Sequence, residues 1–314
     1  MKGAQPRIVV VGSFVTDLVF KTPRRPAVGE TIIGTEFGLF TGGKGYNQAI
    51  AAARMGAEVI MVGRLGTDIF GDMFMQKMQS EGINTDFVVH DVEAGTGVAS
   101  PEIYEDTGNN SIIVIPRANM RVSPADVDAA KDVIASADVL MLQLEIPVEA
   151  SLHAAEIARA NGGAIVFNPA PARPLPDAIY KLANVITPNE IEAGQLTGLS
   201  TTDEAGARAA AKRLREKGVE RVILTLGARG ALMFGPEGET EAPAYKVKVV
   251  DPTAAGDAFC GGLAVAMAKG LSPAEAVKYA NAAGAYAATV LGAEPSMPTL
   301  EKVEAMLKSV SQQG

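Results

Sequence analysis

Short runs of β-branched and other apolar residues recur along this chain, and helix-like stretches lie between and after them. Six such runs are expected to form strands, at residues 7–12, 58–63, 137–145, 163–169, 184–190 and 221–227. The expected helices cover residues 48–55, 69–81, 124–135, 148–161, 191–196, 203–217, 258–269, 273–291 and 300–310. Almost continuously apolar strands that alternate with helices are typical of a mainly parallel sheet covered on both faces. We therefore expect an α/β protein whose central sheet lies between two layers of helices.

Two regions depart from this rhythm, at residues 14–40 and 95–117. Both alternate polar and apolar residues, contain Gly and Pro, and show no helical period. Gly108-Asn109-Asn110 is suited to a hairpin turn because Gly and Asn tolerate positive φ. We expect these regions to add a small β-sheet, a lid, to one core domain that covers residues 1–314.

Composition excludes several classes of function. The sequence has 36 acidic and 28 basic residues and a net charge of −8, without a basic cluster that would favour nucleic acid or an anionic membrane. Its apolar runs are far shorter than the roughly 20 residues that span a bilayer, and its start does not resemble a signal peptide. Cys260 is the single cysteine, so no intrachain disulfide can form. These features predict a cytoplasmic protein.

Polar residues follow the expected strands at five places, at residues 13–17, 143–145, 168–169, 189–192 and 225–230. In an open α/β sheet the ligand crevice lies outside the carboxyl ends of the strands. One such segment is explained equally well by loop chemistry or helix capping. Five together favour a binding site.

The segment TGGKGYNQA, residues 41–49, places three glycines and Lys44 at the start of an expected helix. Glycines allow a ligand to approach the backbone, and a helix N-terminus offers unpaired N–H groups. The segment is not a Walker A loop, and the chain has no G-x-G-x-x-G motif. A solvated lysine beside a glycine turn remains the alternative.

The segment VVDPTAAGDAFCGG, residues 249–262, places Asp251 and Asp257 at the two ends of a run of small residues. The N–H groups of Ala255, Gly256 and Asp257 are predicted to open a helix and to be accessible to a phosphate. A carboxylate beside such a site suits a general base that takes a proton from an attacking hydroxyl. From this segment alone, a simple helix N-cap at Asp257 is an equally good interpretation.

Taken together, these segments resemble the ribokinase-like (PfkB) family of sugar and nucleoside kinases. The resemblance is carried by TGGKGYNQA, LQLEIP, NPAPARPLP, ITPNEIEAGQLTG, LTLGARGA, DPTAAGDAFCGG and GAEPSMP, in that order and over nearly the whole chain. It implies a three-layer α/β/α fold with a β lid that also forms a homodimer contact. It also implies phosphorylation of a sugar hydroxymethyl group by ATP with Mg²⁺ and a K⁺ activator, with the O5 hydroxyl of ribose as the expected acceptor.

The resemblance also assigns roles to single residues. Asp257 resembles the family's base, and the residues that resemble its anion hole are Ala254, Ala255 and Gly256. Sugar-binding positions are matched by Asp17, Gly43, Lys44, Asn47 and Glu145. Nucleotide-binding positions are matched by Asn189, Thr225, Gly227, Gly230 and Asn281, and Glu192 resembles a residue that acts on Mg²⁺ through water. Positions that hold the monovalent cation are matched by Asp251, Thr253, Gly292 and Ser296.

Four residues depart from the family pattern. Val15 stands where an Asn would bind the sugar, and Cys260 replaces a common Asn. Tyr46 and Arg117 stand where small residues are common, and Tyr46 is expected to narrow or line the pocket. Loss of one hydrogen bond to the sugar costs about 1–3 kcal/mol. The choice of acceptor is therefore less firmly implied than kinase activity.

Two alternatives follow. The first is a kinase for a nucleoside or for another sugar, with an aromatic surface for a base drawn from Phe14, Phe37, Phe40 and Tyr104. The second is a regulator that binds sugar or nucleotide without catalysis. Asp257 argues against the second, because a binding protein needs no base.

Overall fold

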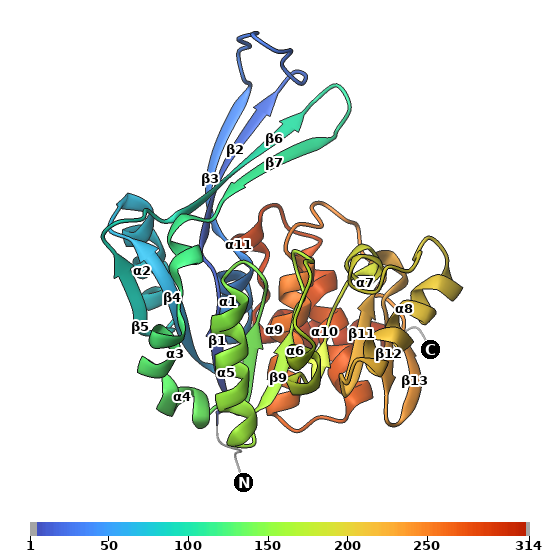
Figure 1. Ribbon diagram of the computed structural model, residues 1–314. Coiled ribbons are helices and arrows are strands. Elements are labelled where there is room, and N and C mark those ends of the chain that lie inside the picture. The colour runs from blue at the N-terminus through green and yellow to red at the C-terminus, as the bar shows by residue number, and fades with distance from the viewer. Residues whose placement is uncertain (1–4, 312–314) are drawn as a thin grey trace.

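A computed structural model describes residues 5–311 of the chain, which form a body with a second sheet extending from it (Figure 1). The body contains a nine-stranded sheet in the order β13-β12-β11-β10-β9-β8-β1-β4-β5. Its strands are parallel except that β12 runs antiparallel to both of its neighbours. The bounds are β1 Arg7–Val11, β4 Glu58–Gly66, β5 Asn84–Asp91, β8 Val139–Leu142, β9 Ala164–Phe167, β10 Val185–Ile186, β11 Arg221–Thr225, β12 Ala231–Gly235 and β13 Gly238–Ala242.

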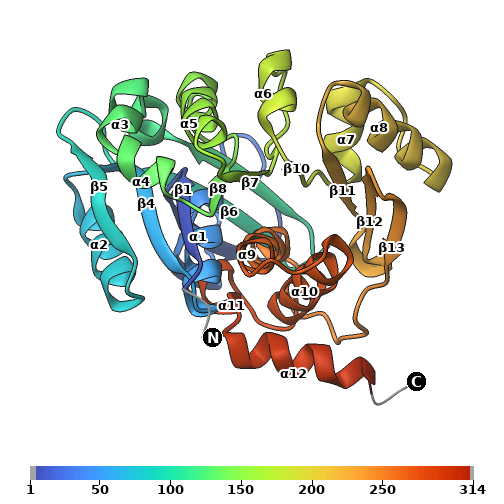
Figure 2. The ribbon, with the colours of Figure 1, turned by 90° about the horizontal axis from the view of Figure 1, so that it is seen from below.

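Helices cover both faces of this sheet (Figure 2). One face carries α3 (Pro124–Ala129), α4 (Lys131–Ala135), α5 (Val148–Ala160), α6 (Asp177–Leu182), α7 (Glu190–Thr197) and α8 (Glu204–Glu216). The other carries α1 (Lys44–Arg54), α2 (Ile69–Ser80), α9 (Ala255–Ala268), α10 (Pro273–Ala287) and α12 (Leu300–Ser311). Two separate clusters of buried apolar side chains fill the two interfaces. The expected three-layer arrangement with a mainly parallel central sheet is confirmed.

The structure also contains elements that the periodicity did not predict. The edge strands β5 and β13 escaped notice because Asn, Asp, Glu, Thr and Gly interrupt their apolar residues. Strand β12, which is apolar and buried throughout, was also not predicted. Helix α6 is too short to show a period, and the single helix expected at residues 124–135 is divided at Ala130 into α3 and α4. Two 3-10 turns, η1 (Arg117–Arg121) and η2 (Gly227–Arg229), and the four-residue helix α11 (Ala293–Ser296) complete the body. No helix within residues 5–311 has both the length and the apolar character needed to cross a membrane.

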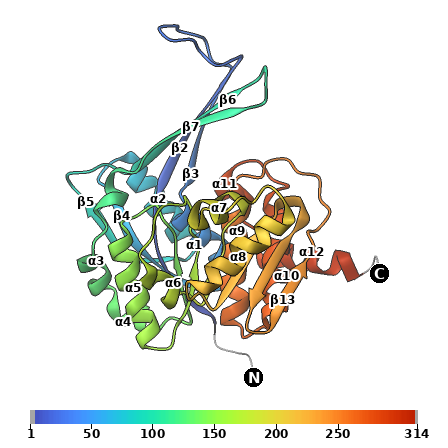
Figure 3. The same cartoon turned by 45° about the vertical axis from the view of Figure 1, so that its right-hand side comes forward.

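The second sheet has four strands in the order β3-β2-β6-β7 and projects from the body as a blade (Figure 3). Its strands are β2 Val15–Thr22, β3 Glu36–Gly42, β6 Gly97–Tyr104 and β7 Asn110–Ile115. Strands β6 and β7 form a hairpin whose turn contains Gly108 at φ 68°, which confirms the turn expected there. We call this second sheet the lid.

The two faces of the lid follow from its register, because neighbouring residues on a strand point to opposite faces. Asp17 pairs with Phe40 and with Ala99, so these three residues share the face that carries Asp17. The opposite face carries Phe20, Phe37, Leu39, Ile113 and Ile115, which are 41 to 62% exposed.

Candidate active site

The site lies where the strand order of the central sheet reverses. Strand β1 has β4 on one side and β8 on the other, so the segments that follow β1 and β8 diverge and leave a crevice at their carboxyl ends. Two contacts bridge this crevice: Glu145 Oε2 accepts hydrogen bonds from Ser13 Oγ at 2.5 Å and from the Lys44 backbone N–H at 2.8 Å. The loops after β1, β3 and β8 therefore meet at one carboxylate.

Asp257 is the central polar group of the site and is only 5% exposed. Helix α9 begins at Ala255, its N-cap is Ala254, and no side chain caps it. The two carboxylate oxygens of Asp257 instead accept hydrogen bonds from Asn47 Nδ2 at 3.0 Å and Gln48 Nε2 at 3.1 Å. The simple N-cap interpretation is therefore wrong, because the carboxylate faces α1 rather than the start of its own helix.

A chain of carboxamides fixes the orientation of Gln48. Gln143 Nε2 donates to Gln48 Oε1 at 2.7 Å, so the Gln48 NH₂ group must face Asp257 and Asn168 Oδ1. Asn168 is oriented in turn because its Nδ2 donates to the Thr187 carbonyl at 3.1 Å. Gln48 was missed as a site residue. Its position directly after Asn47, on a helix that begins with glycines, is the sequence signal by which it could have been found.

The N-terminus of α9 offers fewer free donors than the sequence suggested. The N–H of Ala255 donates to the Pro252 carbonyl at 3.2 Å, whereas no backbone acceptor for the N–H groups of Gly256 and Asp257 is found within residues 5–311. Ala254 adopts the left-handed conformation at φ 58°, which turns the chain into the helix. The expected set of three donors is therefore corrected to the N–H groups of Gly256 and Asp257. A Cβ atom at Gly256 would meet no atom within 4 Å, so the approach to these donors is open.

Two adjoining cavities meet at this turn. The smaller has a volume of about 190 Å³ and is lined by Lys44, Asn168, Ala170, Thr187, Asn189, Glu192, Thr225, Ala254, Gly256, Asp257 and Cys260. The larger has a volume of about 730 Å³, and its lining includes Asn189, Thr225, Gly227, Gly230, Tyr245, Ala255, Gly256, Phe259, Asn281 and Ala288. Asn189, Thr225 and Gly256 line both cavities. A ligand in the larger cavity can therefore reach the carboxylate in the smaller one past Gly256.

The charges around the smaller cavity depend on one another. Burial lowers the pKa of the Lys44 ammonium, but the nearby carboxylates of Asp257, Glu145 and Glu192 outweigh burial and raise it. Burial raises the pKa of Glu192, although a hydrogen bond from the Asn189 backbone and the charge of Lys44 oppose the shift. Asn189 Oδ1 accepts from the Glu192 N–H at 2.8 Å, and Glu192 Oε2 accepts from the Asn189 N–H at 2.9 Å. This reciprocal pair begins α7 at the cavity wall.

The predicted sugar-binding residues form a second group beside this cavity. Glu145 contacts the start of α1, Asn47 contacts Asp257, and Gly43 precedes α1 with φ 93°. Asp17 lies in β2 of the lid, and burial together with the charge of Glu145 raises its pKa to about 7. The structure thus brings Gly43, Lys44, Asn47 and Glu145 together with Asp257, and Asp17 adds a carboxyl from the lid.

The residues expected at a monovalent cation site form a loop beside α9. Asp251 Oδ1 accepts from the Thr253 N–H and Asp251 Oδ2 from the Gly292 N–H, both at 2.9 Å. These hydrogen bonds lower the pKa of Asp251 against the opposing effect of burial. Ser296 is fully buried and donates to the Ala293 carbonyl. Within residues 5–311 no three His, Cys, Asp or Glu side chains cluster as a metal site would require.

Several residues that departed from the family pattern lie outside the cavities. Tyr46 is fully buried against Phe74, with ring centroids 4.8 Å apart, and therefore does not line the pocket. Cys260 does line the smaller cavity, 3.2 Å from Thr187 Oγ1, and burial raises the pKa of its thiol to about 12. Arg117 lies at the base of the lid with φ 46°. Val15 is buried at the start of β2, two residues before Asp17.

The candidate aromatic surface for a base is not formed. Phe14 and Tyr104 are buried, and Tyr104 Oη contacts Glu102 and Ser111. Phe37 lies on the lid face opposite Asp17, where its ring packs against Phe20 with centroids 5.3 Å apart. Of the four aromatic candidates, Phe40 alone shares a face of the lid with Asp17.

Comparison with known proteins agrees with this arrangement. Residues 5–300 match the profile of the pfkB family of carbohydrate kinases. The chain is 42% identical, over 95% of its length, to the bifunctional ribokinase/ribose-5-phosphate isomerase A of Fructilactobacillus sanfranciscensis, of which it spans only 55%. It is 36% identical to the deoxyribokinase of Salmonella typhi, over 94% of this chain and 96% of the relative.

A solved structure shows the same fold over its whole length. The ribokinase of Arabidopsis thaliana in complex with ribose and ATP superposes with a TM-score of 0.90 and 31% sequence identity. The superposition covers 98% of this chain and 99% of the Arabidopsis chain.

Proposed function

This chain belongs to the pfkB family of carbohydrate kinases and is a phosphotransferase that acts on a sugar hydroxyl, and we propose that it is a ribokinase. In this proposal it transfers the terminal phosphoryl group of ATP to the O5 hydroxyl of ribose. The observation that carries the proposal is the position of Asp257, a buried carboxylate held by two amides where the two cavities meet.

Asp257 acts as the general base in this proposal. It accepts the proton of the sugar hydroxyl while that oxygen forms a bond to the terminal phosphorus and the bond to the ADP oxygen breaks. The N–H groups of Gly256 and Asp257 donate hydrogen bonds to the oxygens of the phosphoryl group as it is transferred, and Lys44 adds a positive charge at the same cavity. Asn47 and Gln48 keep the carboxylate of Asp257 turned toward the hydroxyl.

The sugar lies between the body and the lid in this proposal. Asp17, Asn47 and Glu145 offer the oxygen and amide groups that pair with several hydroxyls, and Gly43 and Lys44 lie beside them at the start of α1. A sugar that lacks one of these hydroxyls would leave a buried polar group without a partner, and this cost produces specificity.

ATP occupies the larger cavity in this proposal. Thr225, Gly227 and Gly230 form its strand-end wall, and Asn281 is oriented there because its Nδ2 donates to the Ala242 carbonyl at 2.9 Å. Mg²⁺ would be held by the phosphates and, through water, by Glu192 and Asn189. Such a water-mediated site fits the smaller cavity, because its carboxylates are limited to Glu192 and Asp257. Mg²⁺ would neutralise charge that develops on the phosphates.

A monovalent cation, K⁺, would bind beside the turn that enters α9. The donor set consists of the Asp251 carboxylate and the backbone oxygens near Thr253, Gly292 and Ser296, and oxygen donors suit such an ion. Asp251 already ties the loop before α9 to Gly292 through its hydrogen bonds. Activity in K⁺ buffer that exceeds activity in Na⁺ buffer is the expected result, and equal activity would remove the cation from the proposal.

The lid also carries the proposed homodimer contact. Its face opposite Asp17 exposes Phe20, Phe37, Leu39, Ile113 and Ile115 on paired strands, and an exposed apolar face of this kind is typical of an interface. A second copy of the chain would cover it through the same face. Sedimentation should report a dimer, and Phe37→Glu should yield the monomer.

A deoxyribose kinase is the second candidate, and Val15 is the observation that favours it. An apolar side chain near the sugar site tolerates a missing hydroxyl better than the expected Asn would. A nucleoside kinase is less well supported, because Phe14 and Tyr104 are buried and Phe37 faces away from Asp17.

The deciding experiment measures ADP formation with MgATP and a panel of ribose, 2-deoxyribose, other pentoses, hexoses and nucleosides. A kcat/KM for ribose above that for every other acceptor is the expected result. A preference for 2-deoxyribose or a nucleoside would replace ribose as the acceptor. Binding of sugar and ATP without turnover would instead favour a regulator.

A further inference from the structure

The strands of the lid converge on the body around the backbone of Phe14. Phe14 is fully buried between the end of β1 and the start of β2. A Cβ atom at Gly43, which follows β3, would lie 2.7 Å from Val15 N and 3.1 Å from Phe14 Cα. A Cβ atom at Gly97, the first residue of β6, would lie 2.6 Å from the Phe14 carbonyl oxygen. Three of the four lid strands therefore pass directly against this residue.

The segment that follows the fourth strand, β7, supplies a side chain that forms two hydrogen bonds with Phe14. Asn119 follows β7 in the turn η1 and is fully buried. Its Oδ1 accepts from the Phe14 N–H at 2.9 Å, and its Nδ2 donates to the Phe14 carbonyl at 2.7 Å. One carboxamide thus pairs with both polar groups of one backbone residue, as a neighbouring strand would. We call this pair of hydrogen bonds the clasp.

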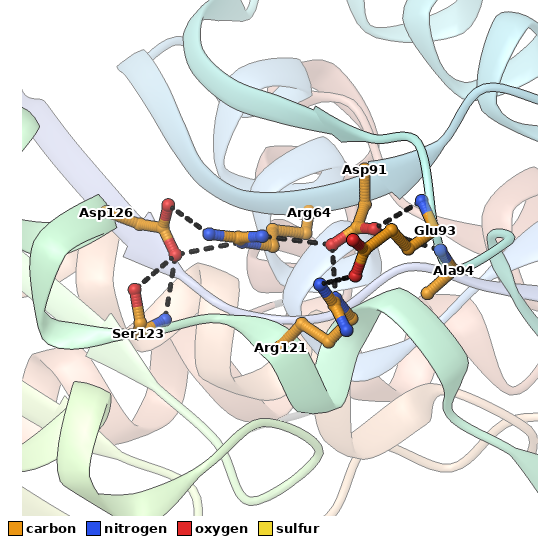
Figure 4. A network of polar contacts seen from close by, with 7 residues as sticks. All are labelled: Arg64, Asp91, Glu93, Ala94, Arg121, Ser123 and Asp126. Atoms are coloured by element: carbon orange, nitrogen blue, oxygen red, sulfur yellow. Dashed lines mark hydrogen bonds and ion pairs between the residues drawn. The ribbon is translucent and has the colours of Figure 1, made fainter.

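The turn that carries Asn119 is fixed to the body at both of its ends. At its start, the Ala118 N–H donates to the Gly95 carbonyl at 3.0 Å, and Arg117 Nη1 donates to the Thr96 carbonyl at 3.2 Å. At its end, Arg121 Nε donates to Asp91 at 2.7 Å (Figure 4).

Arg64 of β4 extends this anchor at the end of η1. Its guanidinium donates to Asp91 at 2.9 Å and to Asp126 with two hydrogen bonds of 2.9 Å (Figure 4). Asp126 in turn accepts from Ser123, which begins α3 directly after η1. The carboxamide of Asn119 is therefore held by the central sheet rather than by the lid.

We propose that Asn119 is a positioning residue for the sugar site and acts through the clasp. Phe14 lies between Ser13, which binds Glu145, and Asp17, which enters the site from the lid. Fixing Phe14 fixes the path of the chain from one of these groups to the other. The nucleotide cavity is lined by residues of β11, α9 and α10, and none of these bonds to Phe14 or Asn119. The inference rests on the proposed function, because it assigns Asn119 to the sugar rather than to ATP.

The test uses Asn119→Leu, which keeps the volume and removes both hydrogen bonds. The KM for ribose should rise about 10-fold or more, while kcat at saturating ribose and the KM for ATP stay within about twofold. Hydrogen exchange at the Phe14 amide should become faster without a matching change in α9. An unchanged KM for ribose, or an equal loss in kcat and in both KM values, would overturn the proposal.

Two further variants act on the same clasp if Asn119→Leu does not fold. Asn119→Asp keeps the acceptor for the Phe14 N–H but places a second acceptor against the Phe14 carbonyl, so the KM for ribose is expected to rise. Gly97→Ala would place its methyl group 2.5 Å from Asn119 Nδ2 and 2.6 Å from the Phe14 carbonyl oxygen. These distances are too short, so the methyl group is expected to push the two hydrogen-bonding groups apart. If neither variant changes the KM for ribose, Asn119 has no positioning role.

A matched control is available at the amino end of β10, an inner strand of the central sheet. Asn184 precedes β10, and its Oδ1 accepts from the buried strand N–H of Ile165 at 2.9 Å. Asn184→Leu should lower the melting temperature and leave the KM for ribose unchanged. If the unmodified chain phosphorylates no pentose, the proposed function is wrong whatever the role of Asn119. Hydrogen exchange at the Phe14 amide then decides separately whether the clasp exists.

Discussion

The phosphoryl-transfer region and the lid are built in opposite ways. Around Asp257, the polar side chains are buried and bonded to one another across α1, α9 and the ends of β8 and β9. In the lid, apolar side chains are exposed on both faces, with Ile112 and Val114 on the Asp17 face and Phe37 and Ile113 on the other. The body thus holds its polar groups in hydrogen-bond networks, whereas the lid exposes apolar side chains on both faces.

This difference indicates how the two regions divide their work. Groups that move a proton or carry charge must be held in one geometry, and buried hydrogen-bond networks provide that rigidity. Asp17 and Val15 lie instead on the lid, whose strands join the body around Phe14. We therefore expect changes near α9 to affect kcat and changes in the lid to affect the KM for the sugar or the choice of sugar.

Asp257→Asn gives the largest expected effect and tests the body side of this division. The variant keeps the shape and an acceptor but cannot accept a proton, so kcat should fall about 10³-fold while ribose and ATP still bind. Steady-state kinetics and calorimetric titration of each substrate measure the two quantities. Turnover near that of the unmodified enzyme would show that Asp257 is not the base.

Gly256→Ala gives the next largest effect. A methyl group at this position meets no protein atom within 4 Å and needs no unusual φ, so the free energy of unfolding should stay the same or rise slightly. The methyl group would occupy the approach to the N–H groups of Gly256 and Asp257, so kcat should fall about 10²-fold. Thermal unfolding measures the change in stability, and steady-state kinetics measure the change in kcat. A loss of stability with full activity would contradict the anion-binding role.

The pH dependence of sugar binding tests the lid side through Asp17. Burial and the charge of Glu145 raise the pKa of Asp17 to about 7, so the carboxyl is protonated below that pH and accepts hydrogen bonds from a hydroxyl less well. The KM for ribose should therefore fall about 10-fold between pH 6 and pH 8. Asp17→Asn should abolish this dependence at a higher KM. A KM that rises with pH would show that the protonated carboxyl is the binding form.

The same raised pKa has a consequence for stability. Because the folded state binds the proton of Asp17 more tightly than the unfolded state does, this group lowers the free energy of unfolding as the pH rises from about 4 to 7. Asp17→Asn should therefore reduce the loss of stability over this range, measured by denaturant unfolding.

The sequence predicted apolar strands better than polar strands, and residues better than their contacts. Strands such as β1 and β11 are almost wholly apolar, and their period identified them, whereas β5 and β13 carry too many polar residues to be recognised. The motifs identified Asp257 and Asn47. The role of Gln48 depends on Gln143, which lies 95 residues away, and only the folded sheet brings the two together. Asn119 gave no signal for the same reason, because its partner Phe14 is 105 residues distant.

Tyr46 shows the limit of assigning a pocket by position in a motif. It follows Gly45 in the glycine-rich segment and was expected to line or narrow the sugar pocket. On α1, however, it lies on the side that packs against Phe74, whereas Asn47 and Gln48 reach Asp257. Neighbouring residues on a helix point about 100° apart, so one position in the motif separates a core residue from a site residue.

Val15→Asn gives the smallest expected effect and sharpens the assignment of specificity to the lid. Val15 shares the lid face of Asp17, because the two residues are two positions apart on β2. An amide at this position would add a partner for a sugar hydroxyl that the apolar side chain does not offer. The ratio of kcat/KM for ribose to that for 2-deoxyribose should rise about 5- to 10-fold, with kcat for ribose unchanged. Val15→Thr, which has nearly the volume of Val but a shorter reach, is the matched control and should change the ratio less. If the ratio stays constant while kcat falls, Val15 lies at the root of the lid as packing alone, and the body rather than the lid selects the sugar.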